Sequence, residues 1–288
     1  MRVLLAGLCT VDVVQRVPDL PEPGHKVQST DVSVAAGGPA TNAAVTVAAL
    51  GAEAFLLTVL GRHPLADLVR ADLTECGVTI LDALPRRDEP PAVSAVTVRE
   101  QDGERTVVSH NAAAVEPEAL SYFDTETLAG MLPETPPDTV LVDGHHPVLA
   151  RTAARWAKAH GRPVVVDAGS WKPVFRDVFG LADVVACSAQ FTAPENALAD
   201  VPVVVTTAGP DPVRWRGRNG SGEVAVPAVE ARDTLGAGDV WHGAFVSKVG
   251  TVGIEEAIEF ANAVASERVR HVGPRSWIGP IRAMMGVT

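Results

Sequence analysis

The feature that most restricts the fold of this chain is a regular alternation of β-rich runs with helical stretches. Strands are expected at 139–142, 163–166, 183–186 and 202–206, and a helix over 148–160 follows the first of them. Parallel neighbouring strands need such crossover connections, and a parallel sheet is covered by helices on both faces. The pattern therefore predicts an α/β fold, a three-layer α/β/α core with a mostly parallel central sheet.

The N-terminal half adds a buried strand at 2–6 and also contains β-rich runs that interrupt the alternation. These runs fall at about 13–34 and 92–110, and the second includes the hairpin signal Gln101-Asp102-Gly103. We expect them to form a small β-sheet that projects from the core as a lid. No linker or internal repeat divides the chain, so residues 1–288 are expected to form a single domain that carries this lid.

The composition describes an ordinary globular chain and argues against several classes of protein. With 288 residues, 47% hydrophobic and 20% charged, there is ample material for a core. The formal net charge of −11 argues against non-specific binding to nucleic acid or to an anionic membrane. Cys9, Cys76 and Cys187 are odd in number and far apart, which argues against a disulfide framework or zinc site. Because no apolar run reaches membrane-spanning length, we expect a cytoplasmic protein.

The strongest chemical signal is the segment Asp233-Thr234-Leu235-Gly236-Ala237-Gly238-Asp239, which leads into an apolar helical stretch. Glycines let the backbone approach a ligand, and the free amides of a helix start attract anions. A carboxylate at this point, Asp239, should repel an anion unless it has a chemical task. The task that fits is to take a proton from a hydroxyl that attacks a phosphoryl group. The alternative is a structural turn in which Asp239 only caps the helix.

A second glycine-rich element, Gly37-Gly38-Pro39-Ala40-Thr41-Asn42-Ala43-Ala44, lies near the N-terminus, with Pro39 suited to the first helical position. Together the two elements resemble the N-terminal and C-terminal signatures of the ribokinase-like (PfkB) carbohydrate kinases. Their order and separation, and the βα alternation with its hairpins, extend the resemblance over nearly the whole chain.

The resemblance implies ATP-dependent phosphorylation of a sugar hydroxyl or a similar alcohol. Asp239 would be the base, and the amides of Gly236, Ala237 and Gly238 would form the anion hole. Four further positions would grip sugar hydroxyls: Asp12, Gly37, Gly38 and Asn42. Without the resemblance, Asp12 could equally be a strand-end turn residue and Asn42 a surface residue of a helix.

Three other residues are candidates for discriminating between substrates: Lys26 and Asn111 on the lid side, and His145 after a strand end. A solvated lysine is the alternative for Lys26. For the nucleotide, Thr207 and Gly209 resemble the T-x-G turn of the family. Asn262 corresponds to a helix that flanks the adenine, and Lys172 to a basic position near the phosphates, with a surface charge as the alternative.

The chain departs from the family pattern where the metals are concerned. ATP and Mg²⁺ are the expected cofactors, but Ser188-Ala189-Gln190-Phe191 stands where relatives carry an N-x-x-E motif. The metal ligands are therefore unknown, although Mg²⁺ can bind through ATP phosphates and water. Many relatives hold K⁺ with carbonyls beside Asp233 and near Gly273; here Arg270 or Arg275 could replace such a cation, so K⁺ dependence is uncertain.

Two other functions stay open at this stage. A nucleoside kinase of the same fold ranks lower, because the aromatic content is 5% and the lid offers few rings to stack a base. A catalytically weak sugar-binding or regulatory protein is the other, because of the altered metal motif. The expected partners are a sugar or sugar acid and ATP, with no nucleic acid or membrane, and a homodimer formed through the β lid.

Overall fold

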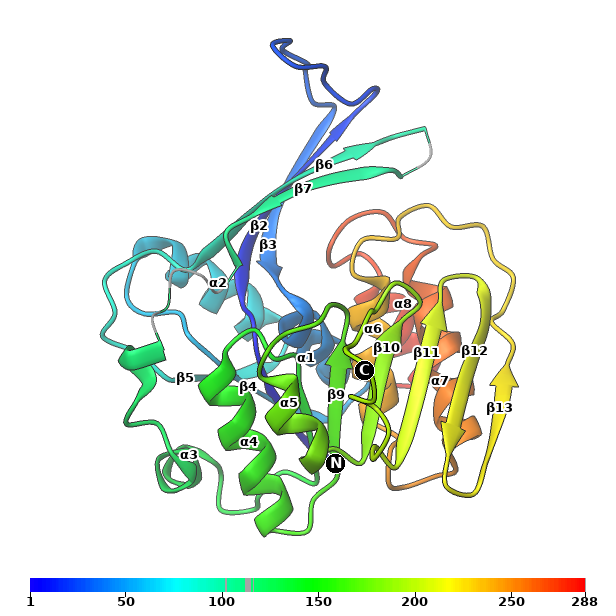
Figure 1. The fold of residues 1–288 in the computed structure, drawn as a ribbon. Helices are drawn as coiled ribbons and strands as arrows, with labels where there is room; N and C mark the ends of the chain where they lie inside the picture. The colour runs from blue at the N-terminus through cyan, green and yellow to red at the C-terminus, as the bar shows by residue number, and fades with distance from the viewer. Residues whose placement is uncertain (102, 112–114, 116, 288) are drawn as a thin grey trace.

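A computed structural model gives the structure of this chain, and it describes residues 1–101, 103–111, 115 and 117–287. Within these residues, nine strands form the main sheet in the order β13-β12-β11-β10-β9-β8-β1-β4-β5 (Figure 1). Pairs from β5 to β11 are parallel, whereas β12 and β13 form an antiparallel edge. The strands are β1 (Arg2–Ala6), β4 (Glu53–Thr58), β5 (Val78–Asp82), β8 (Thr139–Val142), β9 (Val164–Ala168), β10 (Val184–Ser188), β11 (Val203–Ala208), β12 (Asp211–Gly217) and β13 (Gly220–Val224).

Helices cover both faces of this sheet, which gives the three-layer arrangement that the sequence predicts (Figure 1). Successive strand residues point to opposite faces, so Val3 and Leu5 join one apolar cluster while Leu4 and Ala6 join the other. The first cluster includes α1, α2, α6, α7 and α8, and the second α3, α4 and α5. The helices are α1 (Pro39–Ala49), α2 (Pro64–Glu75), α3 (Thr125–Met131), α4 (Pro147–Ala159), α5 (Phe175–Val178), α6 (Ala237–Val246), α7 (Ile254–Arg268) and α8 (Ile278–Met285).

A second sheet projects from the core (Figure 1). In the described chain its four strands run in the order β3-β2-β6-β7, with β2 and β6 parallel and the outer pairs antiparallel. Their bounds are β2 (Thr10–Val17), β3 (Asp31–Gly37), β6 (Ala92–Arg99) and β7 (Arg105–Ser109). This is the small sheet expected from the two β-rich regions. Asp102, in the expected hairpin turn, lies outside the described residues.

Helices α1 and α6 approach each other closely at one glycine. A Cβ atom at Gly243 would lie 2.5 Å from the carbonyl oxygen of Ala43 and 2.7 Å from the Cβ of Thr46. Only a residue without a side chain allows this approach. The close packing brings the N-terminal ends of the two helices, and therefore both glycine-rich elements, to one place.

The fold class expected from the sequence is confirmed, with local corrections. Asp12 lies within β2 of the projecting sheet and not in a loop after β1. The helix expected to reach about residue 271 ends at Arg268, and α3 and the short α5 were not anticipated. Short helices are hard to foresee because three or four turns of hydrophobic periodicity are needed for a clear signal.

Candidate active site

Asp239 lies in the first turn of α6, where the two glycine-rich elements meet. Gly236 precedes the helix in the left-handed conformation, with φ of 73°, a conformation that favours glycine. The side-chain amide of Asn42 on α1 donates a hydrogen bond of 2.8 Å to Oδ2 of Asp239. The structure thus brings Asn42 and Asp239, 197 positions apart in the sequence, into direct contact.

The environment of Asp239 favours its protonated form. Burial of the carboxyl group raises its pKa from the ordinary value of 3.8 to about 6, and the negative charge of Asp167 adds to the rise. The Asn42 hydrogen bond and the His242 side chain oppose this shift, and Asp12 contributes a smaller rise. A carboxylate with a pKa near neutrality is suited to accept a proton from a hydroxyl group.

Amides of the same helix start are placed for an anion. The first N–H groups of a helix have no partner within it, and Gly238 has open space around it, since an added Cβ would meet nothing within 4 Å. The Ala237 N–H donates to the Thr234 carbonyl at 3.2 Å. It is therefore already engaged in the turn, which leaves Gly236 and Gly238 as the better-placed donors of the three expected.

Asp12 on β2 is held in place by hydrogen bonds from neighbouring side chains. The Thr10 hydroxyl donates to its Oδ1 at 2.5 Å. Burial raises the pKa of Asp12, while hydrogen bonds from Thr10 and Ser94 lower it. A Cβ at Gly37 would collide with this carboxylate, so glycine is required there. Asp12, Asn42 and Gly236 line one cavity, together with Arg268, Trp277 and Val14.

Gly38, the second glycine of the N-terminal element, has a backbone role that the structure makes clear. Its φ is 98°, and a Cβ would lie 2.4 Å from the carbonyl oxygen of Leu8. It stands directly before α1 and turns the chain from β3 into that helix. Gly37 and Gly38 therefore shape the site at the start of α1, and a sugar contact at their amides stays a prediction.

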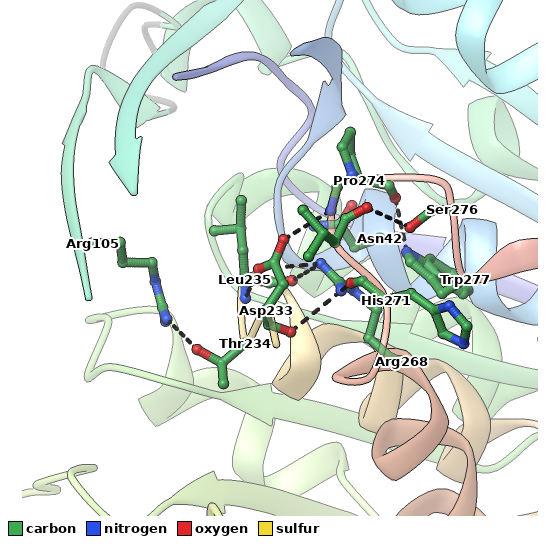
Figure 2. A network of polar contacts seen from close by, with 12 residues as sticks. Asn42, Arg105, Asp233, Thr234, Leu235, Arg268, His271, Pro274, Ser276 and Trp277 are labelled. Atoms are coloured by element: carbon green, nitrogen blue, oxygen red, sulfur yellow. Dashed lines mark hydrogen bonds and ion pairs between the residues drawn. The ribbon is translucent and has the colours of Figure 1, made fainter. Parts of the chain in front are cut away.

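Asp233 and Arg268 form a buried network behind the anion-binding segment (Figure 2). The carboxylate of Asp233 accepts the N–H groups of Leu235 and Gly273, both at 2.9 Å. The Arg268 guanidinium donates hydrogen bonds to the carbonyls of Asp233 and Leu235, which precede α6, and to that of His271, which follows α7. Burial lowers the pKa of Arg268, and the charge of Asp233 opposes this.

The projecting sheet is tied to this network by two arginines. Arg16 on β2 lies 3.4 Å from the Asp233 carboxylate, and Arg105 on β7 donates to the Thr234 hydroxyl at 3.0 Å (Figure 2). Both contacts reach the segment that leads into α6. The sheet expected to act as a lid is therefore connected to the candidate anion hole.

Asp143, at the end of β8, is used for structure and not for a ligand. Its carboxylate accepts N–H groups from Leu8 at 2.9 Å, Ala40 at 3.2 Å and His145 at 2.9 Å. These bonds and the His145 ring outweigh burial and hold the pKa of Asp143 well below its usual range. His145 is partly exposed, with Nδ1 3.3 Å from Asp143, and its contact with a substrate stays a prediction. Burial lowers the pKa of the adjacent His146 to about 4.

The structure does not bring the other expected specificity residues to the Asp12 cavity. Lys26 is exposed in the loop between β2 and β3, far along the projecting sheet from its base (Figure 1). Asn111 has a positive φ of 48° and accepts a hydrogen bond of 2.9 Å from the Ser109 hydroxyl; it lines a separate small cavity with His146. A role for either residue in substrate choice remains a prediction.

The expected nucleotide-side residues fall at the opposite half of the sheet. Thr207 lies at the end of β11, where its hydroxyl donates to the Cys187 carbonyl at 3.4 Å, and exposed Gly209 follows with φ of 62°. The Lys172 Nζ lies 5.3 Å from the centre of the Phe175 ring. Asn262 is buried, and its amide bonds Trp241 at 2.8 Å and the Ala225 carbonyl at 3.0 Å. These two hydrogen bonds fix the chain around Ala225 against α6 and α7.

Asp167 and His242 are site residues that the sequence reasoning missed. Asp167 is the last residue but one of β9, and its Oδ2 lies 3.6 Å from Nδ1 of His242, which follows Asp239 by one helical turn. Both side chains are buried, and both contribute to the pKa of Asp239. A polar residue ending a parallel strand was the available signal, because ligand sites gather at that edge.

The altered metal motif has a structural use in this chain. Ser188 donates to the Gly169 carbonyl at 3.3 Å, and Phe191 packs in an aromatic cluster with Trp171, Phe175 and Phe179. Among the described residues, no group of three or more His, Cys, Asp or Glu side chains could hold a metal ion.

The two arginines expected to replace a monovalent cation beside Asp233 bind other partners. Arg270 is exposed and pairs with Glu267 at 3.3 Å, and Arg275 binds Asp72 at 2.7 Å and the Ala36 carbonyl at 2.6 Å. The cations beside Asp233 are Arg16 from the projecting sheet and Arg268, of which Arg268 is the more deeply buried. This corrects the sequence interpretation.

Comparison with known proteins gives a consistent result. The pfkB family carbohydrate kinase model matches residues 2–279. The chain is 26% identical to ribokinase from Bacillus subtilis, with 94% of each chain covered. It is 28% identical to the ATP-dependent ribose-1-phosphate kinase of Halopiger xanaduensis, covering 96% of this chain and 94% of the relative. The crystal structure of ribokinase from Thermotoga maritima is similar in fold, with a TM-score of 0.77, 22% identity and 98% of both chains covered.

The chain therefore belongs to the PfkB family of carbohydrate kinases and has the ribokinase-like fold. Members of this family are ATP-dependent phosphotransferases that act on hydroxyl groups, and so is this protein. Its acceptor is a sugar or a nucleoside. No helix among the described residues has the length and apolar character to span a membrane.

Proposed function

We propose that this protein transfers the γ-phosphoryl group of ATP to a hydroxyl group of a sugar or sugar derivative in the cavity between β2, α1 and α6. The observation that carries the proposal is the contact between Asn42 and Asp239 at the N-terminus of α6. It places a carboxylate with a raised pKa beside a cluster of helix-start amides. A base and an anion-binding site side by side are what transfer to an alcohol requires.

In this mechanism the sugar lies against Asp12 and Asn42, with one hydroxyl group directed at Asp239. Asp239 accepts the proton of that hydroxyl as the hydroxyl oxygen attacks the γ-phosphorus, and Asn42 holds the carboxylate in place. The bond between the γ-phosphorus and the bridging oxygen breaks at the same time, and ADP leaves. The Gly236 and Gly238 amides stabilise the charge that develops on the transferred group. Mg²⁺ bound with ATP would neutralise phosphate charge, and Thr207, Gly209 and Lys172 are the candidates for holding the nucleotide.

A sugar is favoured over a nucleoside as the acceptor. The described cavity is lined mainly by aliphatic residues, with Asp12, Asn42 and Arg268 as its polar side chains. Its one aromatic lining residue, Trp277, is only 1% exposed. Stacking on an accessible ring is a common way to bind a base. Relatives named as ribokinase and ribose-1-phosphate kinase support the same choice.

A substrate panel tests the proposal. Purified protein is incubated with MgATP and each of a set of pentoses, hexoses, sugar acids and nucleosides, and ADP release is measured. We expect turnover with at least one sugar or sugar acid, well above its ATPase rate without an acceptor. Turnover only with nucleosides would show that the acceptor is a nucleoside and not a sugar. Tight binding of a sugar with no turnover would indicate a sugar-binding protein.

The raised pKa of Asp239 predicts the acid limb of the pH profile. The base must be ionised, so kcat/KM should fall tenfold per pH unit below about pH 6 and be level above it. If the pKa of Asp239 kept its ordinary value of 3.8, this fall in kcat/KM would begin about two pH units lower. The measurement is kcat/KM for the preferred sugar from pH 5 to 8, at saturating MgATP. A flat profile down to pH 5 would contradict a base with this environment.

We also propose that a second copy of the chain covers the projecting sheet. Its edge strands β3 and β7 expose Val32, Val34, Val107 and Val108, with 45–70% of each residue accessible. Exposed edges of this kind invite pairing. Light scattering should give the mass of a dimer, and the double substitution Val32→Lys with Val34→Lys should give a monomer. A monomeric wild-type protein at micromolar concentration would contradict this.

A further inference from the structure

Arg268, the last residue of α7, is a buried cation surrounded by backbone carbonyls. Its side chain is 2% exposed. One guanidinium nitrogen, Nη1, donates to the carbonyls of His271 at 2.7 Å and Asp233 at 3.3 Å, and Nη2 donates to that of Leu235 at 2.6 Å (Figure 2). The Asp233 carboxylate lies 3.7 Å from Nη2 and supplies the negative charge. An unpaired buried charge would be costly, so this oxygen shell is what keeps the guanidinium in place.

The carbonyls belong to two segments that meet at the candidate anion hole. Asp233 and Leu235 lie in the segment before α6, and His271 lies in the loop between α7 and α8. The Asp233 carboxylate links the same two segments through the N–H groups of Leu235 and Gly273. Arg268 therefore joins the anion-binding segment to the body of the fold.

The bond to Leu235 also sets the direction of an amide in the hole. The carbonyl of Leu235 and the N–H of Gly236 belong to one planar trans peptide, so they point in opposite directions. Because Arg268 holds the carbonyl of Leu235, it fixes the orientation of this peptide, and the Gly236 N–H is directed away from the guanidinium. Losing the guanidinium would free this peptide to rotate.

The resemblance to the family implies a K⁺ site at carbonyls of these two segments, and K⁺ does not fit here. The oxygens that would coordinate it are already bonded to a fixed cation. Arg270 and Arg275, the other cations near this loop, bind elsewhere.

We propose that Arg268 is a positioning residue that serves as an internal monovalent cation, so that the kinase activity needs no added K⁺. This inference rests on the proposed function for its kinetic readout. Removing the side chain would leave a cavity lined by three carbonyl oxygens and a carboxylate, which are suitable ligands for K⁺. The geometry thus also assigns a latent cation site to the Arg268→Ala variant.

The wild-type protein provides the first test. With MgATP and the preferred acceptor, kcat in 100 mM potassium chloride should be within about twofold of kcat in tetramethylammonium chloride, a cation too large to be coordinated. Activation of the wild type by K⁺ of about fivefold or more would overturn the proposal, because a free cation site would then exist.

The second test compares Arg268→Ala with Arg270→Ala, which removes an exposed arginine two residues away. In tetramethylammonium chloride, Arg268→Ala should lose about 10²-fold in kcat, as loss of an anion-hole donor does, with KM for ATP and acceptor changed less than about threefold. Adding K⁺ or guanidinium should restore at least tenfold. Arg270→Ala should resemble wild type. Loss without rescue by either cation, or no loss at all, would overturn the proposal.

Thermal unfolding separates this inference from the proposed function. The melting temperature of Arg268→Ala should rise by about 3 °C or more when K⁺ replaces tetramethylammonium, whereas wild type should change by less than about 1 °C. This readout needs no substrate, so it tests the cation site even if no panel compound is phosphorylated. If Arg268→Ala is insoluble, Arg268→Gln, which also removes the charge but retains part of the side chain, undergoes the same series. Equal melting temperatures in both salts would contradict the latent site.

Discussion

Replacing Asp239 with Asn is expected to reduce kcat by about 10³-fold, because general-base catalysis contributes about 10²- to 10⁴-fold. The substitution keeps the shape of the side chain, and the new amide oxygen can still accept the hydrogen bond from Asn42. Binding of a non-hydrolysable ATP analogue, measured by calorimetry, should change little. The variant therefore tests the ability to accept a proton and little else.

Stability provides an internal control for Asp239→Asn. Because the folded protein raises the pKa of Asp239, the ionised carboxylate opposes folding above pH 6. Asn removes that charge, so the melting temperature at pH 7.5 should stay the same or rise. Asp31→Asn, an exposed carboxylate at the start of β3, should leave both kcat and melting temperature unchanged. Full activity of Asp239→Asn would exclude Asp239 as the base.

Gly243→Ala should lower both stability and activity, although Gly243 lies outside the candidate anion hole. The added methyl would approach the Ala43 carbonyl to 2.5 Å and Thr46 Cβ to 2.7 Å, so α1 and α6 must separate. Overpacking of this kind costs about 1–3 kcal/mol in the free energy of unfolding. We expect the melting temperature to fall by about 5 °C. The Asn42–Asp239 bond joins the same two helices, so kcat should also fall, by about tenfold.

Gly279→Ala is the matched control for this substitution. Gly279 lies in α8, and an added Cβ would meet nothing within 4 Å. Alanine favours the helix, so the melting temperature should stay level or rise by a degree or two, about 0.5–1 kcal/mol. Urea unfolding of both variants beside wild type supplies the free energies. Equal stability of the two variants would show that the α1–α6 contact tolerates a methyl group.

The layered fold was predictable because its signals are local. Each buried strand of the main sheet is a short apolar run, and glycine or proline marks most helix ends. Glycine also identified the site, since Gly236 and Gly38 occupy backbone conformations with positive φ that other residues avoid. Asp239 and Asn42 could be proposed as partners from those elements, because both stand at helix starts.

The rest of the site depends on contacts between distant segments. Asp143 follows β8 at the edge of the sheet where ligand groups gather, but its carboxylate accepts three backbone N–H groups, two of them from distant segments. Whether Asp12 lay in a loop or in a strand depended on how β2 pairs with β6. The sequence near Asp143 and Asp12 contains no signal for these contacts with distant segments.

Arg268 illustrates a signal that was present but not used. In α7 the buried residues Ala257, Ala261 and Val264 recur at helical spacing, and Arg268 continues the same stripe. An arginine on an apolar stripe must have buried partners, which singles it out from Arg270 and Arg275. Which carbonyls it would meet depended on the loop between α7 and α8, whose course the sequence does not specify.

We expect a sugar hydroxyl bound beside Asp239 to receive the γ-phosphoryl group of ATP. Phosphorus NMR of wild-type protein with MgATP and the preferred sugar follows the phosphorus atoms themselves. We expect a growing phosphomonoester signal that matches ADP one to one and is abolished in Asp239→Asn. Release of ADP with inorganic phosphate and no phosphomonoester, or a phosphomonoester formed equally by the variant, would contradict it.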